Sequence, residues 1–250
     1  MFRKRLVTAF LISSVCLLLL TSLARDPLRR ALYSYLNDYA SDYYVKQILA
    51  FNARKDLNMP ENAVLFYGDS LVQGLAVQNV HNSAVNYGIG HATSQDVARQ
   101  LREHRNTGKA AAIVIAVGIN DIARGKANQV LPAYQGFLKS IPETVPIIFS
   151  KIMPINEADL RRSGLSENIS LVNYGLEEIC ATSQRVQCLD AGRLLADADG
   201  NLARQYHTGD GLHLNQLGNA IWLEQLQLVV KEVTGAIKEE KRDTSDEQSL

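Results

Sequence analysis

Short apolar runs alternate with amphipathic stretches along most of the chain beyond residue 60. The apolar runs are expected to form strands and cover residues 63–68, 83–90, 109–118, 145–153 and 186–191. Between them, apolar positions recur with the period of a helix at residues 94–106, 128–141, 165–183 and 215–240. The run at 109–118 is apolar on both faces, which is typical of a central parallel strand. This alternation predicts an α/β domain over residues 61–240, with a doubly wound, five-stranded parallel sheet.

The start of the chain departs from this pattern. Leu6 to Ala24 is an uncharged apolar run of 19 residues that follows three basic residues, Arg3, Lys4 and Arg5. Its length is near the minimum for a membrane-spanning helix, and its last residues also fit a signal-peptide cleavage site. We therefore expect residues 1–24 to be an apolar N-terminal helix, either an uncleaved membrane anchor, which we prefer, or a cleaved signal peptide. In both cases the rest of the chain is expected to be exported, on the periplasmic or extracytoplasmic side.

The flanking segments and the charge of the chain indicate less about its organisation and its partners. Residues 25–60 are helical in pattern and are expected to link the apolar segment to the domain, and the polar residues 241–250 to form a disordered tail. The chain has 26 basic and 26 acidic residues and no long basic block beyond its N-terminus, which argues against nucleic acid as a partner. Cys180 and Cys188 lie eight positions apart and either pair in an oxidising compartment or remain two buried thiols.

Polar residues and glycines follow the predicted strands at the points where the strands end. In chain order they are Ser70, Asn86, Gly88, Gly90, Gly118, Asn120, Asp210 and His213. Because the carboxyl ends of parallel strands meet at one edge of a sheet, these residues are expected to converge where such sheets bind ligands. Acyl transfer from an ester needs a hydroxyl, a base and donors for the developing oxyanion, and this set contains all three.

Each residue also has a plainer interpretation. Ser70 would cap a helix after a strand-to-helix turn, and Asn120 with Asp121 would form a turn and a helix cap. His213 would be a surface histidine after an Asp-Gly turn, with Asn215 capping the last helix under either interpretation. His207 lies near the predicted site and could line it, but as a loop histidine it is assigned no role.

Four motifs together resemble the SGNH hydrolase superfamily, the GDSL-type esterases and lipases. They are GDSL at 68–71, NYGIG at 86–90, GIND at 118–121 and DGLH at 210–213. The resemblance implies a flavodoxin-like three-layer α/β/α sandwich. It implies Ser70 as nucleophile, His213 as base and Asp210 as the acid that orients the base. It further implies an oxyanion hole made by the Ser70 N–H, a glycine N–H after the second strand and the Asn120 side chain.

The second motif departs from the family pattern. The family places the donor glycine where this chain has His91, one position after Gly90. The backbone N–H of either residue could donate, and we prefer Gly90.

We therefore expect an exported serine esterase that hydrolyses an acyl ester through an acyl-enzyme, without a metal or a cofactor. O-acetylated carbohydrate, a lysophospholipid or a similar small ester are the candidate substrates. Two other hypotheses stay open at this point. An envelope O-acyltransferase would share the first half-reaction, and a non-catalytic envelope binding module would use the same fold.

Overall fold

The computed structural model describes residues 32, 36 and 39–247, with side chains described as far as residue 235. The apolar segment expected at residues 1–24 lies outside this part of the chain. Among the described residues, no helix combines the length and hydropathy needed to cross a bilayer. The chain divides into two units between Lys46 and Gln47, and the unit that begins at Gln47 contains the whole sheet.

Five parallel strands form the sheet, as the alternating pattern predicts. They are β1 (Val64–Gly68), β2 (Ala84–Asn86), β3 (Ala112–Ala116), β4 (Ile147–Ser150) and β5 (Val186–Leu189). Their order is β2-β1-β3-β4-β5, and Leu65 of β1 pairs with Val85 on one side and Ile113 on the other. The chain leaves β1 first toward one edge and later returns to its other side, so the β1–β3 boundary is the topological switch point of the sheet.

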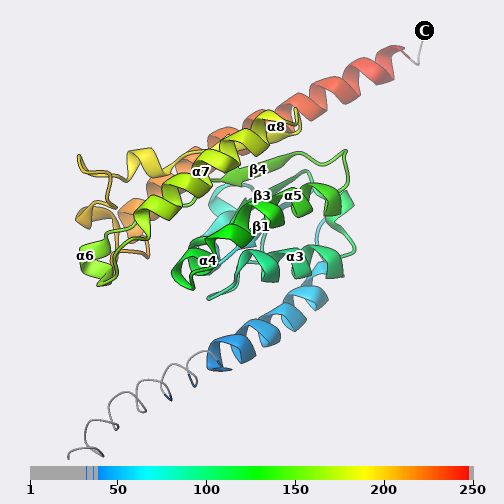
Figure 1. The fold of residues 1–250 in the computed structure, drawn as a ribbon. Coiled ribbons are helices and arrows are strands. Elements are labelled where there is room, and N and C mark those ends of the chain that lie inside the picture. Colours follow the sequence, from blue (N-terminus) through cyan, green and yellow to red (C-terminus); the bar gives the residue numbers. More distant parts are fainter. Residues whose placement is uncertain (1–31, 33–35, 37–38, 248–250) are drawn as a thin grey trace, which may run out of the picture. The chain divides into compact units, whose positions relative to one another are not determined.

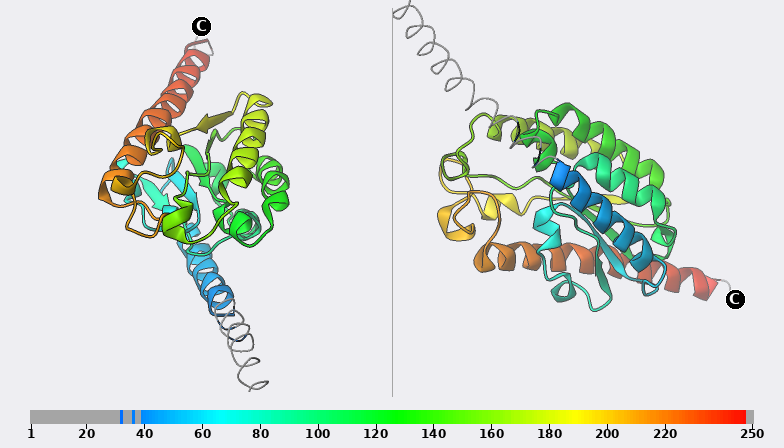
Figure 2. Two further views of the ribbon diagram at one scale, coloured as in Figure 1. Left: turned by 60° about the vertical axis from the view of Figure 1, so that its left-hand side comes forward. Right: turned by 90° about the horizontal axis from the view of Figure 1, so that it is seen from below.

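Long helices cover both faces of the sheet (Figure 1). The helices of one face are α3 (Ser94–Glu103), α5 (Val130–Ser140) and α7 (Ser166–Ala181), and the other face carries α8 (Gln216–Glu247). The left view of Figure 2 shows the strands between these two layers. Within β1, Leu65 and Tyr67 pack into the core beneath α3, α5 and α7, whereas Val64 and Phe66 pack beneath α8. Both faces of the strand are buried, which is why its sequence is apolar throughout.

Short helical turns follow three of the strands. They are α2 (Ser70–Gln73), α4 (Ile119–Ala123) and α6 (Glu157–Leu160). Five 3₁₀ turns occur among the described residues: η1 (Val77–Asn79), η2 (Thr107–Lys109), η3 (Ala127–Gln129), η4 (Gly192–Leu194) and η5 (Arg204–Tyr206). The periodicity of apolar positions does not predict α2, α4 and α6, because one helical turn is too short to show a 3.6-residue period.

A helical segment precedes the sheet, within residues 25–60, for which a helical linker is expected. Residues 39–56 are helical, and the part from residue 47 onward belongs to the same compact unit as the sheet. The Asn52 side-chain N–H donates to the Tyr87 carbonyl at 3.0 Å, and Lys55 Nζ donates to the Asn86 carbonyl at 2.6 Å. These donors serve the carboxyl end of β2, an edge strand, and so satisfy backbone acceptors that a sheet edge leaves unpaired.

The last helix of the domain is longer than expected. Helix α8 continues to Glu247 and so enters the segment 241–250, for which the polar composition predicted a disordered tail. At its start, the Asn215 side-chain oxygen accepts from the backbone N–H groups of Leu217 and Gly218, so the predicted cap is confirmed. Thr93 likewise caps α3 in a capping box with Asp96.

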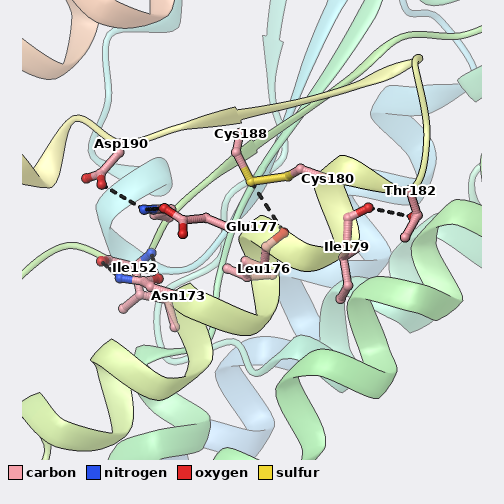
Figure 3. The surroundings of a disulfide bond; sticks show 10 residues. Ile152, Asn173, Leu176, Glu177, Ile179, Cys180, Thr182, Cys188 and Asp190 are labelled. Carbon is pink, nitrogen blue, oxygen red and sulfur yellow. Dashed lines mark hydrogen bonds and ion pairs between the residues drawn. A yellow bond between two sulfur atoms is a disulfide. The ribbon is translucent and has the colours of Figure 1, made fainter.

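Cys180 and Cys188 are joined in a disulfide, the first of the two alternatives that the sequence left open (Figure 3). Cys180 lies in the last turn of α7 and Cys188 in β5, so the bond fixes this helix to an edge strand of the sheet. Close by, Lys151 forms ion pairs with Glu177 of α7 and with Asp190, which follows β5. The covalent bond and the ion pairs tie α7 to the β4–β5 side of the domain.

Candidate active site

Ser70 lies where β1 turns sharply into α2. A Cβ on Gly68, two residues earlier, would stand 2.3 Å from the Ala116 carbonyl oxygen, so only glycine fits at this crossing with β3. The Asp69 carboxylate accepts from the Leu71 N–H at 3.0 Å and thereby caps α2. Ser70 is therefore the first residue of the helix and not its cap, which corrects the plainer interpretation and leaves the hydroxyl available for other contacts.

The Ser70 hydroxyl contacts the imidazole of a residue that is distant in the sequence. Ser70 Oγ lies 2.9 Å from His213 Nε2, and His213 Nδ1 lies 2.6 Å from Asp210 Oδ2. A carboxylate can only accept, so the ring proton is on Nδ1 and the Nε2 lone pair faces the serine hydroxyl. The side chains of His213 and Asp210 are 43% and 44% exposed, so the group is open to solvent. The arrangement is that of a hydroxyl, a base and an orienting carboxylate.

Asp210 is held as a carboxylate. Its Oδ1 accepts from the backbone N–H groups of Leu212 and His213, each at 2.9 Å. Burial raises the pKa of Asp210, but the hydrogen bonds from the His213 ring and from these two N–H groups outweigh it and lower the pKa to about 2. The group is therefore ionised at neutral pH and able to stabilise a positive charge on His213.

Two buried carboxyl groups support the turns around Ser70. Burial raises the pKa of Asp69 to about 7, against the hydrogen bond from Leu71, which lowers it. Burial also raises the pKa of Asp121, in α4, which accepts from the N–H and the hydroxyl of Ser94 at 2.9 and 2.8 Å. Asp121 therefore joins α4 to the start of α3, and the interpretation of Asn120-Asp121 as a helix cap for α4 does not hold, because the N-cap of α4 is Gly118.

Asn120 lies in the first turn of α4, at the carboxyl end of β3. Its Nδ2 donates to the Ala92 carbonyl at 3.0 Å. An amide carries two N–H donors, so this bond fixes the side chain and leaves the second N–H for another acceptor. Because Ala92 belongs to the loop that follows β2, Asn120 also connects the β3 side of the switch point to the loop that contains Gly90.

Gly90 lies in the loop after β2, and its N–H already has an acceptor. It donates to Gln73 Oε1 at 2.8 Å, a residue of α2 that sequence reasoning missed. The next residue, His91, has a backbone φ of 65°, in the region that favours glycine. This is the position where the family pattern has its donor glycine. His91 therefore has a positive φ at the position of that glycine, while the role of Gly90 stays a prediction.

Asn86 fixes the same loop against α2. Its Nδ2 donates to the carbonyls of Val72 and Leu75 at 2.7 and 3.0 Å, and its Oδ1 accepts from the Gly88 N–H at 2.8 Å. The loop is therefore bonded on one side to the helix that begins with Ser70. Within the described part of the chain, no group of three or more histidine, cysteine or acidic side chains is placed to bind a metal ion.

A family model described as the GDSL-like lipase/acylhydrolase family matches residues 62–221. The match covers the sheet and the start of α8, and it begins after the helix of residues 39–56. No curated protein sequence is significantly similar to the chain.

Solved structures share the fold at low sequence identity. A protein from Streptococcus pneumonia proposed to be a platelet activating factor has a TM-score of 0.73 and 23% identity, covering 80% of this chain and 99% of that one. A GDSL-like lipase from Bacteroides thetaiotaomicron has a TM-score of 0.63 and 20% identity, over 75% and 97% of the two chains. A mutant form of an acetyl-xylooligosaccharide esterase from Geobacillus has a TM-score of 0.55 and 18% identity, over 68% and 94%.

Proposed function

The chain belongs to the GDSL-like lipase/acylhydrolase family and is a hydrolase of ester bonds, and on this premise we propose that it is a serine esterase in which Ser70 is the nucleophile. His213 is its general base and Asp210 orients that base. The observation that carries the proposal is the unbroken series of hydrogen bonds from Ser70 Oγ through the His213 ring to Asp210, at 2.9 and 2.6 Å.

The reaction has two halves. His213 Nε2 takes the hydroxyl proton as Ser70 Oγ attacks the ester carbonyl, and then gives this proton to the departing alkoxide. In the second half His213 deprotonates a water molecule that attacks the same carbonyl, and then returns this proton to Ser70 Oγ as the acyl C–Oγ bond breaks. In both halves the Asp210 carboxylate keeps the Nδ1 proton in place and stabilises the imidazolium.

Three donors are proposed for the oxyanion that forms in each half. The Ser70 N–H and the second N–H of Asn120 Nδ2 are two of them, and a backbone N–H of the loop after β2 is the third. If Gly90 is that third donor, the Gln73 side chain must leave its N–H when substrate binds, because Gln73 Oε1 accepts from it at 2.8 Å. Each donor of this kind typically contributes about 10²–10³-fold to the rate.

We further propose a small acyl group on an accessible alcohol as the substrate class, with O-acetylated carbohydrate first among the candidates. The exposure of His213 and Asp210, more than two fifths of each side chain, supports an alcohol that approaches from solvent. The fold that the chain shares with an acetyl-xylooligosaccharide esterase supports the same class. The disulfide supports an exported protein, as do the apolar residues 6–24, which we propose as its membrane anchor.

The test is the hydrolysis of acyl esters by the full chain and by Ser70→Ala. We expect the variant to lose about 10⁴–10⁶-fold in kcat toward p-nitrophenyl acetate. Ser140→Ala, at an exposed serine of α5, is the matched control and should keep full activity. A Ser70→Ala protein that retains its activity would refute the proposal.

A panel of esters with longer acyl chains then defines the substrate class. We expect kcat/KM to fall as the acyl chain grows beyond acetyl. An acetyl donor supplied together with glycan acceptors separates the hydrolase from an O-acyltransferase: free acetate alone supports the hydrolase, and acetylated glycan supports the transferase.

A further inference from the structure

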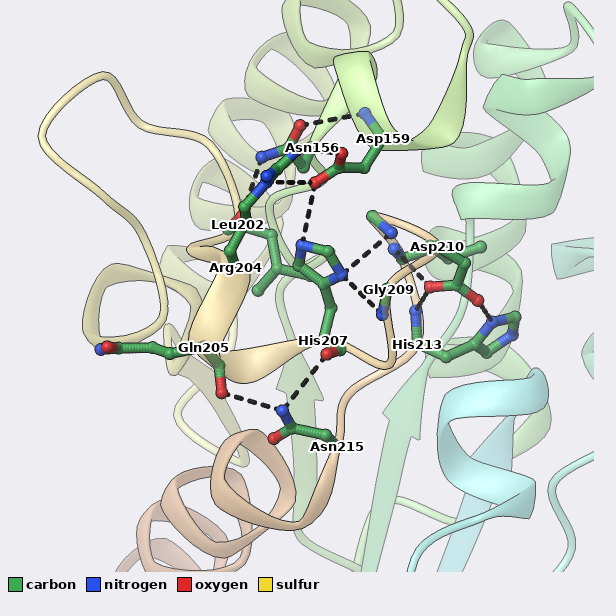
Figure 4. Close-up of polar contacts among 12 residues, drawn as sticks. Asn156, Asp159, Leu202, Arg204, Gln205, His207, Gly209, Asp210, His213 and Asn215 are labelled. Carbon is green, nitrogen blue, oxygen red and sulfur yellow. Dashed lines mark hydrogen bonds and ion pairs between the residues drawn. The ribbon is translucent and has the colours of Figure 1, made fainter.

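His207 has an unusual environment for a loop histidine. It follows η5, and its side chain is only 2% exposed. Its Nδ1 accepts two backbone N–H groups, from Gly209 at 3.0 Å and from Gly211 at 3.1 Å (Figure 4). A ring nitrogen that accepts must carry a lone pair, so Nδ1 is unprotonated and the ring proton is on Nε2.

A carboxylate faces the protonated side of the ring. His207 Nε2 lies 3.4 Å from Asp159 Oδ2 of α6, longer than an ordinary hydrogen bond but close enough to attract the Nε2 proton. Arg204 binds both oxygens of Asp159, at 2.6 and 2.9 Å. The hydrogen bonds and charge of Arg204 lower the pKa of Asp159, so this group is a carboxylate at neutral pH. Asp159 thus favours the tautomer that leaves Nδ1 free to accept.

The two N–H groups that His207 accepts lie on either side of Asp210. Gly209 and Gly211 have φ values of 102° and 76°, so the backbone curls around Nδ1 in a conformation that favours glycine. Gly211 is also fixed from outside, because its carbonyl accepts from the Asn156 N–H at 2.8 Å and a Cβ on it would stand 2.4 Å from the Asn156 oxygen. The carboxylate that contacts His213 is therefore carried by a turn wound around the His207 ring.

We propose that His207 is a positioning residue for the catalytic pair: its unprotonated Nδ1 holds the Gly209–Gly211 turn so that Asp210 keeps its short hydrogen bond to His213. The inference rests on the proposed function for its kinetic consequence. Figure 4 shows the arrangement, with Asp159 on one side of the His207 ring and the turn that carries Asp210 on the other. The domain thus contains two histidine–carboxylate pairs, His207–Asp159 and His213–Asp210. His207 of the first pair holds the backbone turn that carries Asp210 of the second.

Two substitutions separate the acceptor from the bulk of the ring. In His207→Asn the side-chain oxygen lies near the place of Nδ1 and can accept from N–H groups two and four residues on, as asparagine does in turns. In His207→Gln the polar group lies farther out, near Asp159, and the turn loses its acceptor. We expect His207→Asn to keep kcat within about 3-fold of wild type, and His207→Gln to lose about 10–100-fold in kcat with little change in KM, because small displacements of catalytic groups have effects of this size.

The matched control is His81→Gln. The Nδ1 of His81 also accepts a backbone N–H two residues on, from Ser83 at 3.2 Å, but at the opposite end of the sheet, before β2. This variant loses a comparable turn bond away from the site and should retain wild-type kcat. Equal kcat values for His207→Asn and His207→Gln would overturn the inference.

Proton NMR of the full chain gives a readout that does not need turnover. The proton between His213 Nδ1 and Asp210 Oδ2, 2.6 Å apart, is expected to resonate far downfield, and Asp210→Asn identifies it by removing it. We expect His207→Asn to retain this resonance and His207→Gln to lose or broaden it. If the resonance follows this pattern while wild type and Ser70→Ala hydrolyse esters equally, the proposed function fails and the positioning role stands.

The wild-type protein alone supplies a second measurement, in case a variant does not fold. Nitrogen-15 NMR of the His207 ring is expected to report the proton on Nε2 and an unprotonated Nδ1 at neutral pH. A proton on Nδ1 would overturn the inference, because that nitrogen could then not accept from Gly209 and Gly211.

Discussion

Ser70 Oγ and His213 Nε2 lie 2.9 Å apart, although 143 positions separate the two residues in the chain. The contact exists because β1 and the loop before α8 end at the same edge of the parallel sheet. Ser70 is fixed there by the β1–α2 turn, and His213 by the loop wound around His207. The geometry at this one edge supports the chemistry that we propose.

Asp210→Asn tests the orienting role of the carboxylate. The amide can present an N–H to His213 Nδ1. The ring proton would then lie on Nε2, and this nitrogen could not accept the Ser70 proton. We expect kcat to fall by about 10⁴-fold with a small change in KM. Because the Asp210 side chain is 44% exposed, the midpoint temperature of thermal unfolding should change little. A variant that retains kcat would contradict the assigned role.

Asn120→Ala tests the oxyanion donor that we propose in α4. We expect a loss of about 10²–10³-fold in kcat with KM nearly unchanged, because the donor acts on charge that develops only in the transition state. The same change removes the bond to the Ala92 carbonyl, so circular dichroism and thermal unfolding must accompany the kinetics. A change confined to KM would show that Asn120 binds the ground state instead.

Asp69 gives the protein a pH-dependent stability. Burial raises its pKa to about 7 from the ordinary value of 3.8, so between these limits the folded state holds a proton that the unfolded state has released. The free energy of unfolding should therefore decrease as the pH rises through this window. Asp69→Asn keeps an acceptor for the Leu71 N–H and should flatten this dependence in urea unfolding at about pH 5 and about pH 8.

Asp121 also makes the free energy of unfolding decrease as the pH rises, because burial raises its pKa as well. The difference between wild type and Asp69→Asn isolates Asp69 from it. Asp199→Asn, in an exposed turn, is the control and should leave the wild-type dependence unchanged. An Asp69→Asn protein whose stability falls with pH as steeply as that of wild type would show that Asp69 is not the group responsible.

The disulfide between Cys180 and Cys188 is expected to stabilise the fold without affecting the chemistry. Replacing both cysteines by serine should lower the free energy of unfolding by about 2–3 kcal/mol, the value expected for a short closed loop. It should leave kcat unchanged, because the bond links α7 to β5 and contacts none of Ser70, Asp210 or His213. Denaturant unfolding of the oxidised protein and the double variant measures the first effect, and ester hydrolysis the second.

The sheet could be predicted from sequence because its central strands, β1, β3 and β4, are buried on both faces. The run around Ile113 and Ile115 is apolar throughout, and the glycine-containing motifs that follow such runs mark the edge where the site lies. Ser70, Asp210 and His213 could be placed together for the same reason: topology alone brings their loops to one edge. The structure then supplies the distances that connect them.

Other features depend on single long-range bonds that no local pattern encodes. Asn52 and Asp56 look like ordinary polar positions of an amphipathic helix, yet both are buried, and Asn52 binds the carbonyl of Tyr87. Likewise, nothing near Gln73 in sequence indicates that its side chain accepts from Gly90. His207 was assigned no role because a loop histidine reveals neither its burial nor the two N–H groups that surround its Nδ1.

The role of Ser70 as the nucleophile is decided by mass spectrometry of the folded protein after treatment with a fluorophosphonate. We expect one phosphonyl group per chain, on the peptide that contains Ser70, and no such adduct in Ser70→Ala. Labelling should be much slower in His213→Ala, because the hydroxyl then lacks its base. A wild-type protein that hydrolyses esters while Ser70 stays unlabelled, or that carries the label on another residue, would show that Ser70 is not the nucleophile.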